Sequence, residues 1–298
     1  MSNPTPLIEY GAPIDAQAMV APPDTTELEL EAGHPGEGDT AYIARRKSLF
    51  DLCRRHRLES LGPPVIEYTA EETRVWREVT PKLDELHHQH AWGTYLRAKR
   101  DLGITNEQIP QLRTLSERLR PATDMHLVPA EGALPYRTFY EYIARRGFPV
   151  TQFLRHGSHP EFTPEPDVIH DCLGHVPPLM DRDYAELLTL IGKAVATTSH
   201  GDQVLALKRF SWFSIEFGLI EEAGETKVFG AGILSSTGEI PFSLTSTAVT
   251  RRPFVTANVI ATDYDPSHMQ VNLFVAPSLP FLRAELESLV RRFAIPVL

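Results

Sequence analysis

The feature that most constrains the fold is a pair of histidines, His170 and His175, five residues apart in a proline-rich segment. Five residues of an ideal α-helix rotate a side chain by about 140°, so two histidines inside one such helix point apart. Pro164 and Pro166 suit the first turn of a helix, and Gly174 suits the position just beyond its end. We therefore expect His170 to project from a short helix and His175 from the bend after it, with both imidazoles reaching one metal ion.

A third metal ligand is predicted in residues 210–220, where Glu216 is the only charged residue among apolar and small ones. Such a run is typical of a helix that is buried on most sides. An ionised carboxylate is costly in that setting unless it is paired or bound to a metal. Two histidines, one carboxylate and open coordination positions form the ligand set of non-haem Fe(II) oxygenases. His170, His175 and Glu216 are therefore the predicted metal ligands and catalytic residues.

Two other classes of protein would use the same residues. A zinc hydrolase needs a general base beside the metal-bound water, and the histidine motif offers only Asp171 for that role. A binding protein without turnover would keep the fold, but it would be free to lose His170, His175 and Glu216. A buried glutamate taken alone is also more often paired with a basic side chain. The combination of the three ligands favours the iron site.

Length and composition set the class of protein. A chain of 298 residues with 42% hydrophobic residues has room for one large domain or two small ones. It contains no apolar run of about 18 residues, so no membrane-spanning helix is expected, and its N-terminus does not resemble a secretory signal. Cys53 and Cys172 fit the reduced thiols of a cytoplasmic protein, and Cys172 fits a small buried side chain.

The net charge of −10 is concentrated at the N-terminus. Residues 1–40 contain eight acidic residues, six prolines and no Lys or Arg, which leaves a charge of −2 for residues 41–298. An acidic, proline-rich segment without periodicity cannot bury enough surface to fold alone, so we predict a flexible arm over residues 1–40. The remainder has no basic stripe, and nucleic-acid binding is therefore not expected.

Hydrophobic periodicity predicts a mostly helical α+β fold, in which residues 41–298 form a single catalytic domain with a small β component. The expected helices lie at 41–60, 69–90, 93–102, 107–119, 135–146, 182–198, 203–222 and 278–293. A short strand or hairpin is expected at 226–234, and extended chain at 254–275.

Two helix starts have clear capping residues. Thr69 and Glu72 fit a capping box, and Ser278 fits an N-cap. The three histidines within residues 87–90 fall near the end of the helix that Thr69 begins. No carboxylate or cysteine at suitable spacing completes a metal site with them, so we expect them to interact favourably with the helix dipole.

Four segments resemble, in the same order, the pterin-dependent aromatic amino acid hydroxylases, the family of the phenylalanine, tyrosine and tryptophan hydroxylases. These segments are TQFLRHGS at 151–158, TPEPDVIHDCLGHVP at 163–177, WFSIEFGL at 212–219 and FGAGILSS at 229–236. The motifs are long, and the resemblance extends from about residue 63 to about residue 295. Within the family, the chain resembles the bacterial phenylalanine hydroxylases.

The resemblance implies Fe(II), a tetrahydropterin as two-electron donor and O₂ as co-substrate, in the ring hydroxylation of a free aromatic amino acid. It implies that the backbone of Ala133 and Leu134 contacts the pterin, that Phe139 stacks on the pterin ring and that Asp171 belongs to the cofactor site. Without the family, Phe139 is simply a core residue. Asp171 stands where animal members have Glu, and the shorter side chain also occurs in bacterial phenylalanine hydroxylases.

A free amino acid needs a guanidinium for its carboxylate, and Arg155 is the candidate because its fork matches a carboxylate. We expect Asp167 to hold that guanidinium in place. The resemblance adds Thr163 and Ser235 as further substrate-binding residues. A purely structural salt bridge between Arg155 and Asp167 is the alternative.

Trp212 lies four residues before Glu216, so both project from nearly the same helix face and the indole forms a wall for the substrate ring. Phe217 is a second aromatic candidate for the substrate pocket. In the family, Trp at this position accompanies phenylalanine and tyrosine hydroxylases, whereas tryptophan hydroxylases have Phe. The predicted substrate is therefore L-phenylalanine and the product L-tyrosine, with tryptophan hydroxylation as an alternative.

Two departures from the family concern the position of hydroxylation. Ser211 replaces a tyrosine that the family usually places beside the pterin and iron. Asp265 and Pro266 lie in a segment that aligns with a substrate-selecting loop but match no member's pattern. Both changes could alter which ring carbon faces the oxidant, so 3-hydroxylation to meta-tyrosine is a second expectation.

Two segments of animal relatives have no counterpart in the sequence: the N-terminal regulatory domain and the C-terminal heptad helix that makes tetramers. We therefore expect a monomer or weak dimer. Its expected partners are small molecules, an aromatic amino acid and a pterin, and neither a nucleic acid nor a membrane.

Overall fold

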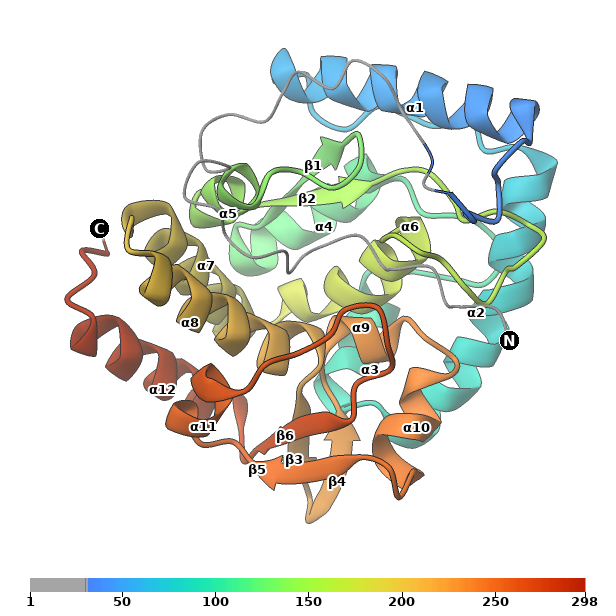
Figure 1. The fold of residues 1–298 in the computed structure, drawn as a ribbon. Coiled ribbons are helices and arrows are strands. Elements are labelled where there is room, and N and C mark those ends of the chain that lie inside the picture. Colours follow the sequence, from blue (N-terminus) through green and yellow to red (C-terminus); the bar gives the residue numbers. More distant parts are fainter. Residues whose placement is uncertain (1–29, 31, 298) are drawn as a thin grey trace.

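The computed structural model describes residues 30 and 32–297, which form a mostly helical structure with two small sheets (Figure 1). The predicted α+β class is confirmed. The helices are α1 (Thr40–Leu58), α2 (Ala70–His90), α3 (Gly93–Asp101), α4 (Leu112–Thr123), α5 (Tyr136–Ala144), α6 (Val168–His170), α7 (Arg182–Thr197), α8 (Gly201–Ser211), α9 (Ala231–Leu234), α10 (Glu239–Thr245), α11 (Thr256–Ala261) and α12 (Leu279–Arg292). The strands are β1 (His126–Ala130), β2 (Gly147–Thr151), β3 (Leu219–Glu222), β4 (Glu225–Val228), β5 (Thr250–Pro253) and β6 (Asn272–Ala276).

The two sheets lie on opposite sides of the molecule, with α6, α7, α8 and α9 between them (Figure 1). β1 and β2 form a parallel pair near α1, and the larger sheet has the strand order β4-β3-β6-β5. Within the larger sheet, β3 and β4 form an antiparallel hairpin. The strand or hairpin expected at 226–234 is right only for the end of β4, because residues Ala231–Leu234 form the helix α9 and the partner strand β3 lies within the helix expected at 203–222. One apolar core fills the space between the sheets, and its largest fully buried side chains include Trp76, Tyr95, Tyr184, Phe210 and Phe213.

Both predicted capping motifs are confirmed. The Thr69 hydroxyl accepts a hydrogen bond from the Glu72 backbone N–H at 3.1 Å, and the Glu72 carboxylate accepts one from the Thr69 N–H at 2.7 Å. The Ser278 hydroxyl accepts from the Phe281 N–H at 3.2 Å at the start of α12. These side chains satisfy backbone donors that a helix leaves unpaired in its first turn. Such short-range pairing is why these helix starts could be predicted from the sequence.

The helix expected at 107–119 lies further along the chain than predicted. The structure begins α4 at Leu112 and continues it past Pro121, and the chain between the helices expected at 107–119 and 135–146 contains the strand β1. The Gln111 side chain exchanges two hydrogen bonds, of 2.9 and 3.0 Å, with the backbone of Ile66. This long-range pairing fixes the residue before α4 and cannot be read from local propensity.

Two further predicted segments are wrong. The helix expected at 203–222 ends at Glu216, because the chain turns at Gly218, whose N–H donates to the Ser214 carbonyl at 3.0 Å, and then enters β3. The extended segment expected at 254–275 contains the helix α11 before β6. The β-branched residues of α11 favour a strand, but packing against α8, where the Arg209 guanidinium donates to the Ile260 carbonyl at 2.8 Å, decides the conformation.

The prediction for the histidines at the end of α2 is wrong for His87. Its side chain is fully buried, and its Nε2 donates to the Leu234 carbonyl at 2.6 Å. Burial, together with the nearby Lys99 ammonium, lowers the pKa of His87 to about 3. A neutral imidazole cannot interact with the helix dipole as a cation, so His87 acts through its hydrogen bond.

The predicted flexible arm over residues 1–40 can be compared with the structure only near its C-terminal end. Most of residues 1–40 lies outside the described residues, but His34 is buried beside the Glu165 carboxylate, 3.6 Å away.

Cys53 and Cys172 are both buried and free. Among the described helices, none combines the length and apolar character needed to cross a membrane.

A buried carboxyl group at the start of α10 lies outside any predicted site. Glu239 is 8% exposed, and its Oε2 has no hydrogen-bond partner among the described residues. Burial raises the pKa of Glu239 to about 7, although a hydrogen bond from the Gln270 backbone opposes the shift. Because the folded state holds this proton more tightly than the unfolded chain, stability falls as pH rises from about 4.5 to about 7.

We expect Glu239→Gln to raise the free energy of unfolding at pH 8 by about 1–3 kcal/mol, because the amide is neutral where the wild-type carboxylate must be ionised. The gain should shrink as the pH is lowered toward 4.5. Urea unfolding at pH 5, 6, 7 and 8 measures the difference, with the exposed Glu117→Gln as control. A gain that is the same at every pH would contradict the assignment.

Candidate active site

The three predicted metal ligands come together between the two sheets. His170 Nε2 lies 3.1 Å from His175 Nε2. Glu216 Oε1 lies 3.2 Å from His175 Nε2, and Glu216 Oε2 lies 4.0 Å from His170 Nε2. Among the described residues, these three form the one set of His, Cys and acidic side chains whose ligand atoms all lie within 4.8 Å of one another.

The spacing of five residues is explained by a π-helical turn rather than by the predicted bend. After α6, residues Asp171–His175 form the turn η1, in which the Val176 N–H donates to the Asp171 carbonyl at 3.0 Å. Hydrogen bonds between residues five apart place His170 and His175 one above the other on the same side. The chain therefore stays helical through His175.

The prediction that Pro164 and Pro166 begin the helix before η1, and that Gly174 ends it, is wrong. The helix begins after Asp167, not at Pro164 or Pro166, because the Asp167 carboxylate caps it by accepting from the His170 N–H at 3.0 Å. Gly174 does not end the helix. A Cβ at that position would lie 2.6 Å from the Ala231 carbonyl, so glycine is required for close packing of η1 against α9.

A second π-helical turn positions the carboxylate. The turn η3 (Trp212–Glu216) follows α8, and the Phe217 N–H donates to the Trp212 carbonyl at 2.8 Å. It brings Glu216 to the end of the helical segment, facing the two histidines. All three candidate ligands therefore lie in or directly beside π-helical turns, a local geometry that often marks functional sites.

The donor set fits a metal ion. Donors about 2.1 Å from one ion that meet it at right angles are about 3.0 Å apart, close to two of the three separations observed here. The His170 imidazole is oriented for this role, since the Ser235 hydroxyl donates to the Ala231 carbonyl at 2.8 Å and lies 2.9 Å from His170 Nδ1. Nδ1 therefore carries the proton, and the Nε2 lone pair faces the other ligands.

The electrostatics of the cluster also suit a cation. Burial lowers the pKa of His170 to about 4, and the neighbouring His175 adds to this effect. Burial opposes a charge on His175 as well, but the Glu216 carboxylate raises the pKa of His175 above its usual value. Burial likewise disfavours an ionised Glu216, yet the two histidines hold the pKa of that carboxyl below its usual value. These shifts favour a protonated His175 beside an ionised Glu216, and a bound metal ion would displace that proton.

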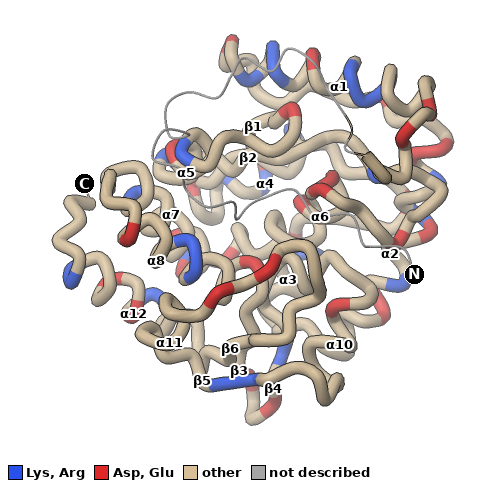
Figure 2. The backbone as a smooth tube through the Cα atoms, in the orientation of Figure 1, with Lys and Arg blue, Asp and Glu red and all other residues tan. Residues whose placement is uncertain are grey.

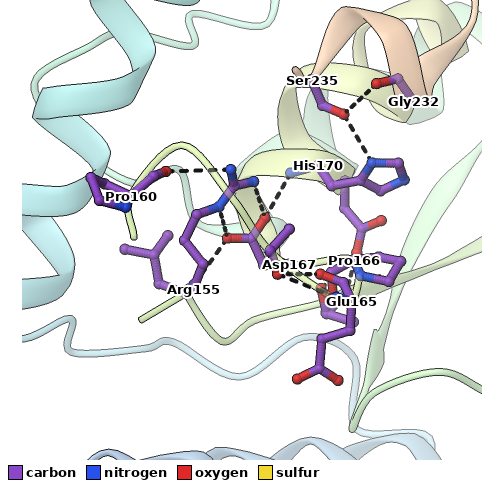
Figure 3. Close-up of polar contacts among 12 residues, drawn as sticks. Arg155, Pro160, Glu165, Pro166, Asp167, His170, Gly232 and Ser235 are labelled. Atoms are coloured by element: carbon purple, nitrogen blue, oxygen red, sulfur yellow. Dashed lines mark hydrogen bonds and ion pairs between the residues drawn. The ribbon is translucent and has the colours of Figure 1, made fainter. Parts of the chain in front are cut away.

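The predicted carboxylate-binding residue, Arg155, is held by Asp167 next to the candidate ligand His170 (Figure 3). Asp167 Oδ2 accepts from Arg155 Nε at 2.8 Å and from the Arg155 backbone N–H at 3.0 Å, and Oδ1 accepts from Nη2 at 2.8 Å. Arg155 Nη1 makes only a long contact, of 3.4 Å, with the Pro160 carbonyl. The guanidinium therefore keeps donor capacity for an anion. Thr163 donates to the Glu165 carbonyl at 2.5 Å and lies half-buried in the same loop.

Aromatic rings form the other wall of the site. The Trp212 ring centroid lies 4.6 Å from that of Phe217 and 4.1 Å from that of Tyr264, whose plane is inclined to the indole by 12°. The Tyr264 ring was not predicted as part of the wall. The Ser211 hydroxyl accepts from the Tyr140 hydroxyl at 3.1 Å, so a tyrosine from α5 reaches the position next to Trp212.

The residues assigned to the pterin by resemblance lie on one side of the cluster. Ala133 and Leu134 belong to the turn between β1 and α5, and Phe139 projects from α5 with its ring 5.7 Å from that of Phe148. The Phe148 ring in turn lies 5.0 Å from the His175 imidazole. Phe139 is only partly buried, so one part of its surface remains accessible.

Asp171, the fourth residue of this set, is held by Thr151 on β2. Its Oδ2 accepts from the Thr151 backbone N–H at 2.7 Å and from the Thr151 hydroxyl at 2.8 Å. Burial raises the pKa of Asp171 to about 7, against the opposing effects of the nearby His175 and these hydrogen bonds. The side chain therefore links the first residue of η1 to the β1–β2 sheet.

A sequence model of the biopterin-dependent aromatic amino acid hydroxylases matches residues 16–297. The chain belongs to this family.

Individual relatives have different substrates. The chain is 42% identical over 214 residues to a chloroplastic phenylalanine 4-monooxygenase of Physcomitrium patens, covering 71% of this chain and 53% of the relative. It is 37% identical over 274 residues to tyrosine 3-monooxygenase of Bos taurus, covering 90% and 55%. The crystal structure of Chromobacterium violaceum phenylalanine hydroxylase with Fe(III) and 7,8-dihydrobiopterin aligns with a TM-score of 0.72 and 31% identity, covering 76% of this chain and 84% of that one. The chain spans little more than half the length of these curated relatives.

In this chain, a network that the sequence did not reveal supports η1 from the side opposite the candidate ligands. The Leu173 carbonyl cannot be paired within a helix, because the residues four and five positions later, Pro177 and Pro178, have no N–H. The buried Tyr95 hydroxyl donates to this carbonyl at 2.6 Å. His87, beside Tyr95, donates to the Leu234 carbonyl, directly before the Ser235 that orients His170. Two side chains from α2 and α3 thus hold both segments that position the ligands.

We expect Tyr95→Phe to lower the free energy of unfolding by about 1–3 kcal/mol, because the buried Leu173 carbonyl loses its partner. Metal affinity should fall by about tenfold, since η1 is less firmly held. Urea unfolding and competition with a chelator measure the two effects.

Tyr184→Phe is the matched control for Tyr95→Phe. The Tyr184 hydroxyl is also fully buried but has no hydrogen-bond partner among the described residues. Its removal should leave stability and metal affinity unchanged or improved. Equal effects of the two substitutions would show that the Tyr95 hydrogen bond does not support η1.

Proposed function

We propose that this chain is a tetrahydropterin- and O₂-dependent monooxygenase that hydroxylates the ring of free L-phenylalanine to give L-tyrosine. The observation that carries the proposal is the two-histidine, one-carboxylate cluster beside a buried Arg155 and the Trp212 wall. Family membership supports it, as do the relatives that are phenylalanine hydroxylases. Tyrosine 3-monooxygenases match at similar identity. The relatives therefore support an aromatic amino acid as substrate, and the choice of phenylalanine is our proposal.

Fe(II) is the metal that the donor set suits, and His170, His175 and Glu216 would hold it. When bound, Fe(II) and the tetrahydropterin supply the activation of O₂. The residues of the chain would bind and orient the iron, the pterin and the substrate, and they would exclude water from the site. Ser235 fixes the His170 tautomer, and Tyr95 and Thr151 hold η1 in place. On the cofactor side, we propose that the backbone of Ala133 and Leu134 contacts the pterin, that Phe139 stacks on it and that Asp171 lies at its edge.

Substrate orientation follows from the opposite side of the site. The Arg155 fork would bind the amino acid carboxylate, with Asp167 holding the guanidinium and Thr163 in the same loop. Trp212 and Phe217 would contact the substrate ring. Ser235 hydrogen-bonds His170 directly, so we propose that it acts on the substrate through that imidazole. Tryptophan, with its larger bicycle, would overlap with Trp212, which disfavours it by about tenfold or more relative to phenylalanine.

Iron-loaded protein incubated with tetrahydropterin and O₂ should convert phenylalanine to para-tyrosine, and should turn over phenylalanine at least about tenfold more efficiently than tryptophan. Chromatography against ortho-, meta- and para-tyrosine standards identifies the product. Meta-tyrosine as the sole product would overturn the regiochemistry and support the second expectation, for which Ser211 and the loop around Asp265 are the reasons. Stoichiometric zinc without O₂ uptake would favour a hydrolase.

Arg155→Lys should raise the KM for phenylalanine by about tenfold or more, because a point charge cannot replace the bidentate fork. The KM for the pterin should change little. Arg74→Lys, on the exposed face of α2, is the control and should leave both values unchanged. Steady-state kinetics with each substrate varied in turn make the measurement, and an unchanged KM for phenylalanine would return Arg155 to a purely structural role.

A further inference from the structure

A single buried side chain joins the loop 264–270 to the aromatic wall of the site. Gln270 is 5% exposed, and its Oε1 accepts from the Trp212 indole N–H at 3.1 Å. Its Nε2 donates to the Asp265 carbonyl and to the His268 carbonyl, each at 2.7 Å. Both N–H groups and the oxygen of the amide are thus paired within the protein. The amide closes the loop and binds the indole at the same time.

The same loop holds Trp212 in a second way. The Tyr264 ring stacks on the indole with a centroid separation of 4.1 Å and an angle of 12°. The indole is therefore fixed at its polar edge by the last residue of the loop and over its face by the first. Since a buried indole N–H without a partner is costly, the orientation of Trp212 depends on where the loop places Gln270.

The loop is anchored at both ends to elements outside it. Before Tyr264, the Asp263 carboxylate pairs with Arg209 at the end of α8, and Figure 2 shows acidic positions of this segment beside the basic end of α8. At the other end, the Gln270 backbone hydrogen-bonds the buried Glu239 of α10. Between the anchors, Ser267 and His268 turn back onto the exposed Asp265 side chain. Of the polar side chains between 264 and 270, Gln270 is the buried one.

We propose that Gln270 is a positioning residue that transmits the conformation of the loop 264–270 to Trp212 and thereby sets the choice of aromatic substrate. The inference rests on the proposed function, in which Trp212 forms the wall against the substrate ring. Gln270 itself contacts neither the metal ligands nor Arg155. Its effect is expected in the discrimination between substrate rings and in the ring position that is hydroxylated, rather than in metal binding.

Gln270→Met tests the proposal, because methionine has nearly the same length and none of the three hydrogen bonds. The ratio of kcat/KM for phenylalanine to that for tryptophan should fall by about tenfold or more, and ortho- or meta-tyrosine should appear among the products. Binding of the two amino acids to the iron-loaded protein without O₂, measured by calorimetry, should show the same loss of discrimination. Iron stoichiometry and the KM for the pterin should be unchanged.

Gln111→Met is the matched control, since Gln111 also clamps backbone, that of Ile66, with two hydrogen bonds. It should lower the melting temperature and leave the substrate ratio unchanged. Gln270→Glu covers the case in which the methionine variant does not fold: it keeps the acceptor for Trp212 but loses both donors to the loop carbonyls, and it should also reduce the ratio.

The outcomes separate this inference from the proposed function. Wild-type protein that turns over no aromatic amino acid would overturn the proposed function itself. Wild-type protein that prefers phenylalanine, together with Gln270 variants whose substrate ratio stays within about twofold of wild type while stability falls, would overturn the role of Gln270 alone. A reduced ratio in the Gln270 variants, with an unchanged ratio in Gln111→Met, would support it.

Discussion

The site depends first on the buried carboxylate of Asp167. It accepts from the Arg155 side chain through two nitrogens, from the Arg155 backbone N–H and from the N–H of His170. One side chain thus caps the helix that presents a candidate metal ligand and orients the guanidinium proposed to bind substrate. Burial disfavours the ionised form, yet Arg155 and these hydrogen bonds hold the pKa of Asp167 below its usual value. Removing either partner would leave an uncompensated buried charge, which costs several kcal/mol.

The second constraint is the pair of π-helical turns. An ordinary helix places residues three and four apart on one face, whereas η1 aligns His170 with His175. The π-turn and the prolines after it leave the Leu173 carbonyl without a backbone partner, and Tyr95 supplies one from α3. The local geometry that brings the ligands together is therefore stable only because a distant side chain satisfies the group it exposes.

The sequence predicted what depends on residue type and short-range pairing, and missed what depends on distant contacts. The capping of α2 by Thr69 and the lone carboxylate Glu216 both follow from local pattern. The π-helical turns do not, because hydrophobic periodicity assumes an ordinary helix, and α11 was missed because its β-branched residues favour a strand. Tyr95 and Gln270 carry no local signal at all. Each looks like an ordinary polar residue until the fold places it against a carbonyl or an indole from another segment.

The two sides of the site differ in how they are held, and this difference has a consequence for specificity. The metal side is built from helical turns, an N-cap and buried backbone hydrogen bonds, so a change there disturbs the packing of η1 against α9. The Trp212 side, which we propose contacts the substrate ring, depends on one amide and one stacked ring from the loop 264–270. Within that loop, Asp265 is exposed and Pro266 is half-buried, and neither belongs to the metal side. On the role proposed for Gln270, substitutions there would reorient Trp212 without altering the candidate metal donors.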